Sequence, residues 1–442
     1  MSSIAPLQSK HDAAEQLRHQ AIDLFIAGHK SSEICRQLGR SRTWLSDTLA
    51  RYQVGGRAAL VSRSRAPHTS PKRIASDVEA AIVRLRKVIT SGEDPQLRYG
   101  NLGADALAVE LERAGISPPS RATINRVLKR HALLQPRPRR KAKRKLPDDY
   151  PWPGVSQANQ LHLLDFVSRV MVGGRRVYGC NLLDQARRWP YLDAILSKTA
   201  GAVGQFLVGA WQEMGLPSGL YLDNDVVWRG SGSGQRTFSH IVRLCLLLGV
   251  QVIFTPPYTP GANPVVESFN GVWDRNFWRR TDFGSLSQIR TELSYFQHYC
   301  RYRRAWAEFD NQTAAQHFAH FVPTLLAADF TRHQQPPLPL TAGQVHFIRF
   351  VTEQGTFSML NETWQLDPDR WAGKTIRATL NTKQQRLSIY HQAQPDATPV
   401  LITHFNYRLK ERVVPLPAEF QRPTLALWSA SDVSIVKVSA MC

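Results

Sequence analysis

Three acidic side chains stand at positions where an ionised carboxylate needs a partner. Asp165 interrupts an apolar strand pattern, Asp223 ends another, and Glu267 follows a Pro-rich loop at the start of a helical pattern. A carboxylate inside an apolar strand is costly unless it is paired or binds a cation, and converging like charges oppose each other's ionisation. Divalent cations remove this penalty, and two Mg²⁺ ions held by carboxylates activate a water or a 3′-hydroxyl at phosphorus. Together, the three residues predict a metal site for phosphodiester chemistry.

Taken singly, each carboxylate also has a purely structural interpretation. Asp223 and Glu267 could end or cap their elements, and Asp165 could pair with one of many arginines. The combination favours the metal site because it occurs in a basic chain with alternating strands and helices. The stretch 230–234 resembles a phosphate-binding loop only in composition, since no Lys-Ser/Thr follows it.

Strand and helix patterns must bring these residues together. Patterns typical of antiparallel strands cover residues 161–170, 175–183 and 189–196. Helices then alternate with short apolar strands as far as residue 279. We expect a mixed sheet with helices on both faces, within a core domain of residues 151–330.

The C-terminal third continues with helices and then short strands. Helical periodicity covers residues 286–304 and 312–328. Short strands at regular spacing within residues 340–420 predict a small β-barrel domain. Residues 421–442 form a C-terminal tail without a recognisable function.

The first third predicts two DNA-binding helical domains. Residues 1–55 have the pattern of a helix–turn–helix, whose last helix lies in the major groove of DNA. A basic linker, 56–75, leads to a second such domain at 76–135, and a basic tether follows at 136–150. The structural alternatives are trihelical units and solvated linkers without DNA contact. The predicted DNA-binding residues are Arg42, Thr43, Ser46, Arg51, Arg63, Arg65, Arg121, Asn125, Arg126, Arg130, Arg139, Arg140 and Lys141.

Composition points to nucleic acid as the partner. The 442 residues include 56 Lys and Arg against 35 Asp and Glu, a formal charge of +21, and residues 1–150 hold 28 of these basic residues against 14 acidic ones. Such an excess predicts a polyanionic partner. A membrane fits less well, since no apolar run approaches the ~18 residues of a spanning helix and the first ten residues lack a signal-peptide profile. Five scattered cysteines support neither a disulfide framework nor a zinc site, so we expect a cytoplasmic, nucleoid-associated protein.

The same residues carry a family resemblance. Leu-Leu-Asp165, Leu222-Asp223-Asn224, the run Phe254-Thr-Pro-Pro-Tyr-Thr-Pro-Gly and Val266-Glu267-Ser-Phe-Asn270 are similar to motifs of DDE transposases in the retroviral-integrase superfamily. The resemblance implies a ribonuclease-H-like core. The paired helix–turn–helix domains and C-terminal strands resemble bacterial insertion-sequence transposases and phage Mu transposase.

The resemblance assigns roles to individual residues. It implies that Asp165, Asp223 and Glu267 hold two Mg²⁺ ions, which Mn²⁺ can replace. Asn224 would support the second aspartate, Asn270 would face the same DNA, and Tyr258 would border the site. Three features depart from the family: Asp225 replaces a glycine, Pro264 replaces another, and residues 229–236 form an insert. Asp225 would either compete for the metal or point away.

The sequence thus predicts a DDE transposase or integrase. It would bind the terminal repeats of a mobile element, cleave the 3′ ends and join them to target DNA. The resemblance implies a homo-oligomer on paired double-stranded DNA ends. The alternatives are a DNA-binding regulator with an inactive core, a plain ribonuclease-H-like nuclease, and one subunit of a larger complex with an ATPase partner.

Overall fold

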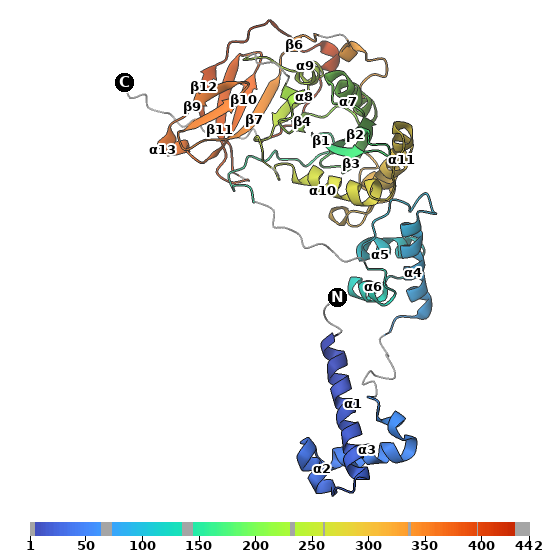
Figure 1. Ribbon diagram of the computed structural model, residues 1–442. Coiled ribbons are helices and arrows are strands. Elements are labelled where there is room, and N and C mark those ends of the chain that lie inside the picture. Colours follow the sequence, from blue (N-terminus) through green and yellow to red (C-terminus); the bar gives the residue numbers. More distant parts are fainter. Residues whose placement is uncertain are drawn as a thin grey trace. The chain divides into compact units, whose positions relative to one another are not determined.

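The structure is a computed structural model that describes residues 5–62, 73–134, 145–229, 235–259, 261–334, 337–395 and 397–428. The chain forms two compact units, Met1–Ile74 and Ala75–Cys442 (Figure 1). Several predictions concern residues outside those described: Arg63, Arg65, Arg139, Arg140, Lys141, residues 230–234 of the insert and residues 429–442 of the tail. Within the described ranges, no helix is long and apolar enough to cross a membrane.

The N-terminal unit has the helices of a helix–turn–helix. They are α1 (Ala5–Ile26), α2 (Ser31–Leu38) and α3 (Arg42–Gly55), followed by a short 3₁₀ turn, η1 (Arg57–Leu60). Gly39 ends α2 in the left-handed conformation with a φ of 61°, and the Ser41 hydroxyl caps α3 by accepting the Trp44 amide at 3.2 Å. Ala21, Ile34 and Leu45 are buried where the three helices meet.

A second helical module opens the larger unit. It consists of α4 (Ser76–Ser91), α5 (Ala104–Arg113) and α6 (Arg121–Arg130). Its loop docks on the core: Arg98 donates to Glu292 at 2.9 Å, and Tyr99 packs against Phe277 with ring centroids 5.4 Å apart. Arg280 of the core donates back to the Gly100 carbonyl at 2.9 Å. The module is therefore packed against the core within the larger unit.

The predicted mixed sheet is present. β1 (Leu161–Val170), β2 (Arg176–Asp184) and β3 (Trp189–Ile195) pair in antiparallel order, and β4 (Gly219–Leu222) and β5 (Gln251–Phe254) run parallel to β1. The helices of this region are α7 (Ala200–Met214), α8 (Val226–Arg229), α9 (His240–Leu247), α10 (Pro264–Trp273) and α11 (Leu286–His298).

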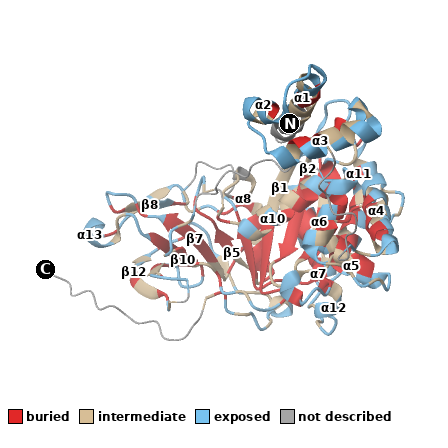
Figure 2. Ribbon diagram, turned by 90° about the horizontal axis from the view of Figure 1, so that it is seen from below, coloured by how far each residue is buried: buried red, intermediate tan, exposed pale blue. Residues whose placement is uncertain are grey.

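Helices cover both faces of this sheet (Figures 1 and 2). Leu182 packs with Trp211 of α7 in one buried cluster. The next residue of β2, Leu183, packs with Phe269 of α10 and Leu293 of α11 in another. Successive side chains of a strand point to opposite faces, so β2 contributes apolar side chains to the buried clusters on both faces of the sheet.

The helix predicted over residues 312–328 is mostly wrong. Only α12 (Ala314–His317) forms, with Thr313 and Gln316 in a capping box. Pro323 prevents a helix from continuing through to residue 328, because a proline inside a helix removes a hydrogen bond and clashes with the preceding turn. The helices α10 and α11 each continue into a π-helical turn, η2 (Asp274–Trp278) and η3 (Tyr299–Arg303). Short 3₁₀ turns also occur at η4 (Ala307–Phe309), η5 (Arg332–Gln334) and η6 (Ala418–Phe420).

Of the eight C-terminal strands described, four extend the core sheet and four pair in two separate two-stranded sheets, β6 with β13 and β8 with β9, instead of forming the expected barrel. They are β6 (Leu340–Thr341), β7 (Gln344–Phe350), β8 (Thr356–Met359), β9 (Glu362–Gln365), β10 (Thr375–Asn381), β11 (Arg386–His391), β12 (Val400–Asn406) and β13 (Val413–Val414), with a short helix α13 (Pro368–Trp371). β7 pairs in parallel with β5, which gives one sheet in the order β12-β11-β10-β7-β5-β4-β1-β2-β3. The described strands close no barrel, because β7 finds its partner in the core.

Candidate active site

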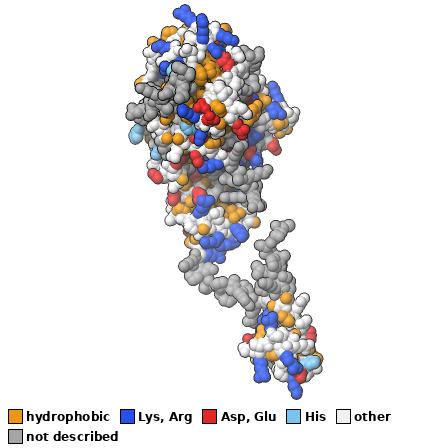
Figure 3. All heavy atoms as spheres, turned by 90° about the vertical axis from the view of Figure 1, so that its left-hand side faces the viewer, with side chains coloured by type: hydrophobic (Ala, Val, Ile, Leu, Met, Phe, Trp, Pro, Cys, Tyr) orange, Lys and Arg blue, Asp and Glu red, His pale blue; other side chains and the backbone are white. Residues whose placement is uncertain are grey.

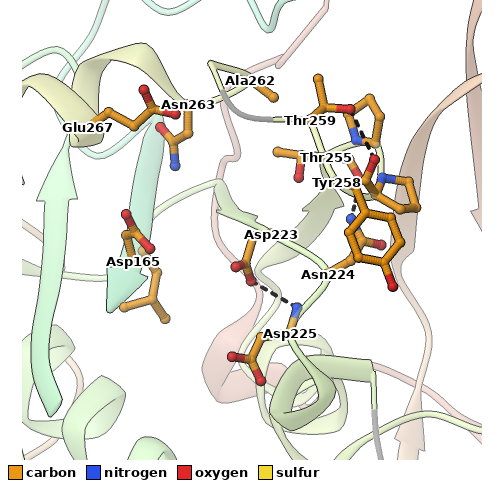
Figure 4. A pocket seen from close by; sticks show the side chains of 13 residues that line it. Asp165, Asp223, Asn224, Asp225, Thr255, Tyr258, Thr259, Ala262, Asn263 and Glu267 are labelled. Carbon is orange, nitrogen blue, oxygen red and sulfur yellow. Dashed lines mark hydrogen bonds between the residues drawn. The ribbon is translucent and has the colours of Figure 1, made fainter. Parts of the chain in front are cut away.

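Three carboxylates from three elements line one cleft of about 580 Å³ (Figure 4). Asp165 lies in β1, Asp223 directly follows β4, and Glu267 lies in the first turn of α10. β1 and β4 pair in parallel with Leu163 opposite Tyr221. Asp165 lies two residues after Leu163, and Asp223 lies two residues after Tyr221. The register of the two strands therefore brings both aspartates to the same cleft.

Asp165 carries the clearest electrostatic signature of the cleft. Burial, followed by the charges of Asp223 and Glu267, raises the pKa of Asp165 to about 6. Two hydrogen bonds oppose this rise: the Phe166 amide donates to Oδ1 at 2.8 Å, and the Asn270 side chain donates to Oδ2 at 2.7 Å. The charges of Asp223 and Glu267 therefore add to the effect of burial on Asp165, and a bound cation would relieve their repulsion.

Asn270 links Asp165 to the neighbouring strand. Its side-chain oxygen accepts a hydrogen bond from Asn181 at 2.8 Å while its amide donates to Asp165. Asn181 stands opposite Asp165 in the pairing of β1 and β2 and is fully buried. The two side-chain amides thus connect Asp165 to β2 through hydrogen bonds.

Asp223 and Asp225 have different partners. Asp223 is exposed, and its Oδ1 accepts hydrogen bonds from the Trp228 indole at 2.6 Å and the Asp225 amide at 3.0 Å. The Asp225 carboxylate is paired with Lys198. Asp225, which stands where the sequence resemblance leads one to expect a glycine, therefore forms an ion pair with Lys198.

Glu267 is oriented by the loop that precedes its helix. Its Oε1 accepts the Gly261 amide at 2.7 Å. Pro264 stands at the start of α10, where a helix needs no amide donor and a fixed φ is favourable. The proline is therefore compatible with the helix that carries Glu267.

Tyr258 stands at the rim of the cleft. Its side chain is fully exposed, and its φ of +53° lies in the left-handed region, which a bulky residue rarely adopts. The loop thus holds an aromatic ring in solvent beside the carboxylates, a position suited to contact with an incoming ligand.

The donor set suits a hard divalent cation, because carboxylate oxygens are the ligands that Mg²⁺ and Mn²⁺ prefer. Among the described residues, however, no three His, Cys, Asp or Glu side chains are grouped as ligands of one ion. Asp223 and Glu267 accept hydrogen bonds from Trp228 and Gly261. Asp165, Asp223 and Glu267 fit a cation by residue type and by their mutual repulsion. To bind it, Asp223 and Glu267 would have to exchange their hydrogen bonds with Trp228 and Gly261 for contacts with the ion.

The predicted DNA-binding side chains fall into two groups. Arg42, Thr43 and Ser46 are exposed on α3, and Arg126 is exposed on α6 beside the half-buried Asn125. On the face shown in Figure 3, Lys and Arg side chains lie on both units.

The other predicted contacts have intramolecular partners. Arg51 donates to the carbonyl oxygens of Ala59 at 2.6 Å and Val61 at 2.7 Å, so it holds η1 against α3. Arg130 is bound to the buried Glu79 at 2.6 Å. Arg121 forms an exposed ion pair with Asp105 at 3.3 Å, which is weak in water. Arg51 and Arg130 are therefore structural in this conformation.

Sequence reasoning missed four residues around the cleft: Asn181, Lys198, Trp228 and Arg349. A signal existed for Asn181, since it is a polar residue inside the apolar strand that pairs with Asp165. None existed for Arg349, which contacts Asn224 from 125 positions further along the chain.

Comparisons with known proteins give one family model and several solved structures. A chain of the simian T-cell lymphotropic virus intasome is 15% identical, with 69% of this chain and 91% of that chain covered and a TM-score of 0.34. The catalytic core domain of BIV integrase is 17% identical over 37% of this chain and 95% of that chain, with a TM-score of 0.29. The catalytic core domain of HTLV-2 integrase in complex with magnesium is 10% identical over 36% and 95%, with a TM-score of 0.28.

The family model concerns the N-terminal unit. It is described as a winged helix-turn helix and matches residues 18–80, from within α1 to the first turn of α4. The match agrees with the helices α2 and α3 and the turn between them. The helix–turn–helix predicted from the sequence is confirmed.

Proposed function

We propose that this chain is a DNA transposase or integrase that binds the ends of a mobile element, cleaves their 3′ ends and joins them to target DNA. The observation that carries the proposal is the cleft in which Asp165, Asp223 and Glu267 converge from β1, β4 and α10. The helix–turn–helix match and the charge of +21 support DNA as the substrate.

The three carboxylates would hold Mg²⁺, or Mn²⁺ in its place, as a pair of ions. When bound, the metal supplies positive charge at the phosphorus and lowers the pKa of an attacking water or hydroxyl. Asn270 and the Phe166 amide hold both oxygens of Asp165, and Lys198 neutralises Asp225. The exposed ring of Tyr258 would contact the DNA strand at the rim.

Specific DNA binding would come from the exposed face of α3, where Arg42, Thr43 and Ser46 lie. Asn125 and Arg126 of α6 would contact DNA from the module docked on the core. Paired ends would be held by a homo-oligomer.

The test begins with the DNA. Duplexes bound by the full-length protein are selected from a random double-stranded library and then incubated with the protein and Mn²⁺. We expect 3′-end nicking and joined products from wild type, and neither from Glu267→Gln, with DNA binding retained. The matched control is Asp225→Asn, which alters a nearby acid paired with Lys198 and should retain cleavage.

Tight binding without cleavage would overturn the proposed enzyme. That outcome would favour the regulator, and the reaction would be repeated with candidate ATPases to test a multi-protein complex. Equal loss of cleavage in Glu267→Gln and Asp225→Asn would contradict the assignment of the three carboxylates.

A further inference from the structure

One buried arginine of the C-terminal strands reaches both loops of the cleft. Arg349 lies on β7 with 6% of its surface exposed. Its guanidinium donates to the carbonyl oxygens of Thr255 and Ser358, each at 2.9 Å, and to the side-chain oxygen of Asn224 at 3.1 Å. The amide of Asn224 also donates to the Thr255 carbonyl. Arg349, Asn224 and Thr255 thus form a closed set of contacts.

These contacts lie at the base of the cleft. Asn224 is next to Asp223 at the end of β4, and Thr255 begins the loop that leads from β5 to Tyr258. Among the described residues of these two segments, the backbone hydrogen bonds between them end with the one from the Thr255 amide to the Leu222 carbonyl, at 2.9 Å. Beyond the paired strands, side-chain contacts must therefore hold the Asp223–Asn224 turn and the Thr255 loop in position relative to each other.

We propose that Arg349 is a positioning residue, which clamps the Asp223–Asn224 turn to the Thr255 loop and so sets the orientation of Asp223. A planar guanidinium can bond two acceptors in fixed directions, whereas the ammonium of lysine cannot reproduce this fork. The proposal rests on the proposed function for its catalytic consequence, but the clamp itself is a property of the fold. It makes the C-terminal strands part of the active site.

Arg377 provides a matched control. It lies on the neighbouring strand β10, opposite Ile348 of β7, and is 8% exposed. Its guanidinium packs on the rings of Tyr390 and Trp428 at 4.5 and 4.1 Å. Both arginines are buried in the same part of the sheet, but the contacts of Arg377 lie away from the cleft.

The first measurement needs no activity. Hydrogen exchange is followed in full-length wild type, Arg349→Lys and Arg377→Lys, in peptides covering residues 219–229 and 251–259. We expect Arg349→Lys to exchange at least ~10-fold faster in both peptides, because lysine cannot make the hydrogen bonds of the buried guanidinium to both loops. Arg377→Lys should match wild type in these peptides. Unchanged exchange in Arg349→Lys would overturn the clamp.

The second measurement is a double-mutant cycle with Asn224→Ala, which removes the acceptor while leaving Arg349 in place. With the selected duplex and Mn²⁺, each single variant should lower the cleavage rate by ~10- to 100-fold, and the double variant should lose little more. Additive losses would refute the coupling. If wild type cleaves no DNA, the proposed function fails while the exchange data still decide whether Arg349 clamps the loops.

Discussion

Replacing Asp165 with asparagine should make the protein more stable at neutral pH while abolishing its activity. Burial and the charges of Asp223 and Glu267 raise the pKa of this acid from 3.8 to about 6 in the folded protein. The folded state therefore binds the proton more tightly than the unfolded chain. For an acid with a raised pKa, stability is highest when the group is protonated and is lost as the pH rises from about 4 to about 6.

The size of the gain follows from two opposing contributions. A difference of about two pKa units corresponds to ~3 kcal/mol of destabilisation at pH 7, which asparagine removes. Asparagine has only one side-chain acceptor oxygen, however, and the Phe166 and Asn270 amides donate to two different oxygens of Asp165. One donor left unpaired costs about 1 kcal/mol or more, so we expect a net gain of about 1–2 kcal/mol.

The assay is urea unfolding of full-length wild type and Asp165→Asn at pH 7.5 and pH 5 in the presence of EDTA. The destabilisation that the variant removes should be about half as large at pH 5, where folded wild-type Asp165 is mostly protonated. Asp225→Asn is the control, since it removes a paired acid and should give no gain at pH 7.5. The reasoning is refuted if Asp165→Asn is no more stable than wild type at pH 7.5, or if its advantage is equally large at pH 5.

The other predictions separate structural from DNA-binding roles. Arg42→Ala should weaken duplex binding and lower the slope of log affinity against log salt by ~1, as measured by fluorescence anisotropy. Arg51→Ala should instead lower the melting temperature of the N-terminal unit, because it leaves two backbone carbonyls without their hydrogen-bond donor. Identical binding and melting profiles of the two variants would argue against these roles. Arg280→Ala removes the hydrogen bonds to the loop of the second helical module and should speed proteolysis within residues 73–134; an unchanged digestion pattern would contradict the docking. A chain ending at residue 339 lacks β7 and exposes the edge of β5, so it should aggregate; a soluble, natively folded product would contradict the shared sheet.

Local patterns were sufficient to predict the mixed sheet of the core and the elements in which Asp165, Asp223 and Glu267 lie. The apolar run around Asp165 fixes β1 because a strand buried on two faces needs apolar residues on both sides. The ends of β4 and the start of α10 follow from similarly local signals, a short apolar run and a Pro-rich loop. The convergence of Asp223 with Asp165 then depends only on parallel pairing, which the alternation of strands and helices predicts.

Partner choice between distant segments could not be predicted in this way. The strand pattern of β7 is the same whether it closes a barrel or joins β5, and only the tertiary fold decides. Arg51 and Arg130 have the sequence positions expected of recognition-helix residues, yet the Ala59 and Val61 carbonyls and Glu79 accept hydrogen bonds from them. A long basic side chain reaches several acceptors, so its sequence position alone does not identify its partner.

The contrast between two neighbouring acids supports a functional cleft over an inactive one. Asp225 shows what a structural carboxylate at this position looks like: it is paired with Lys198 and caps the local turn, its Oδ1 accepting the Val227 amide at 3.1 Å. Asp165 has no cationic partner of this kind among its hydrogen bonds with the described residues, and burial, followed by the charges of Asp223 and Glu267, raises its pKa to about 6. Destabilising arrangements persist where activity requires them, so the raised pKa of Asp165 agrees with the proposed cation site better than with the alternative of an inactive scaffold.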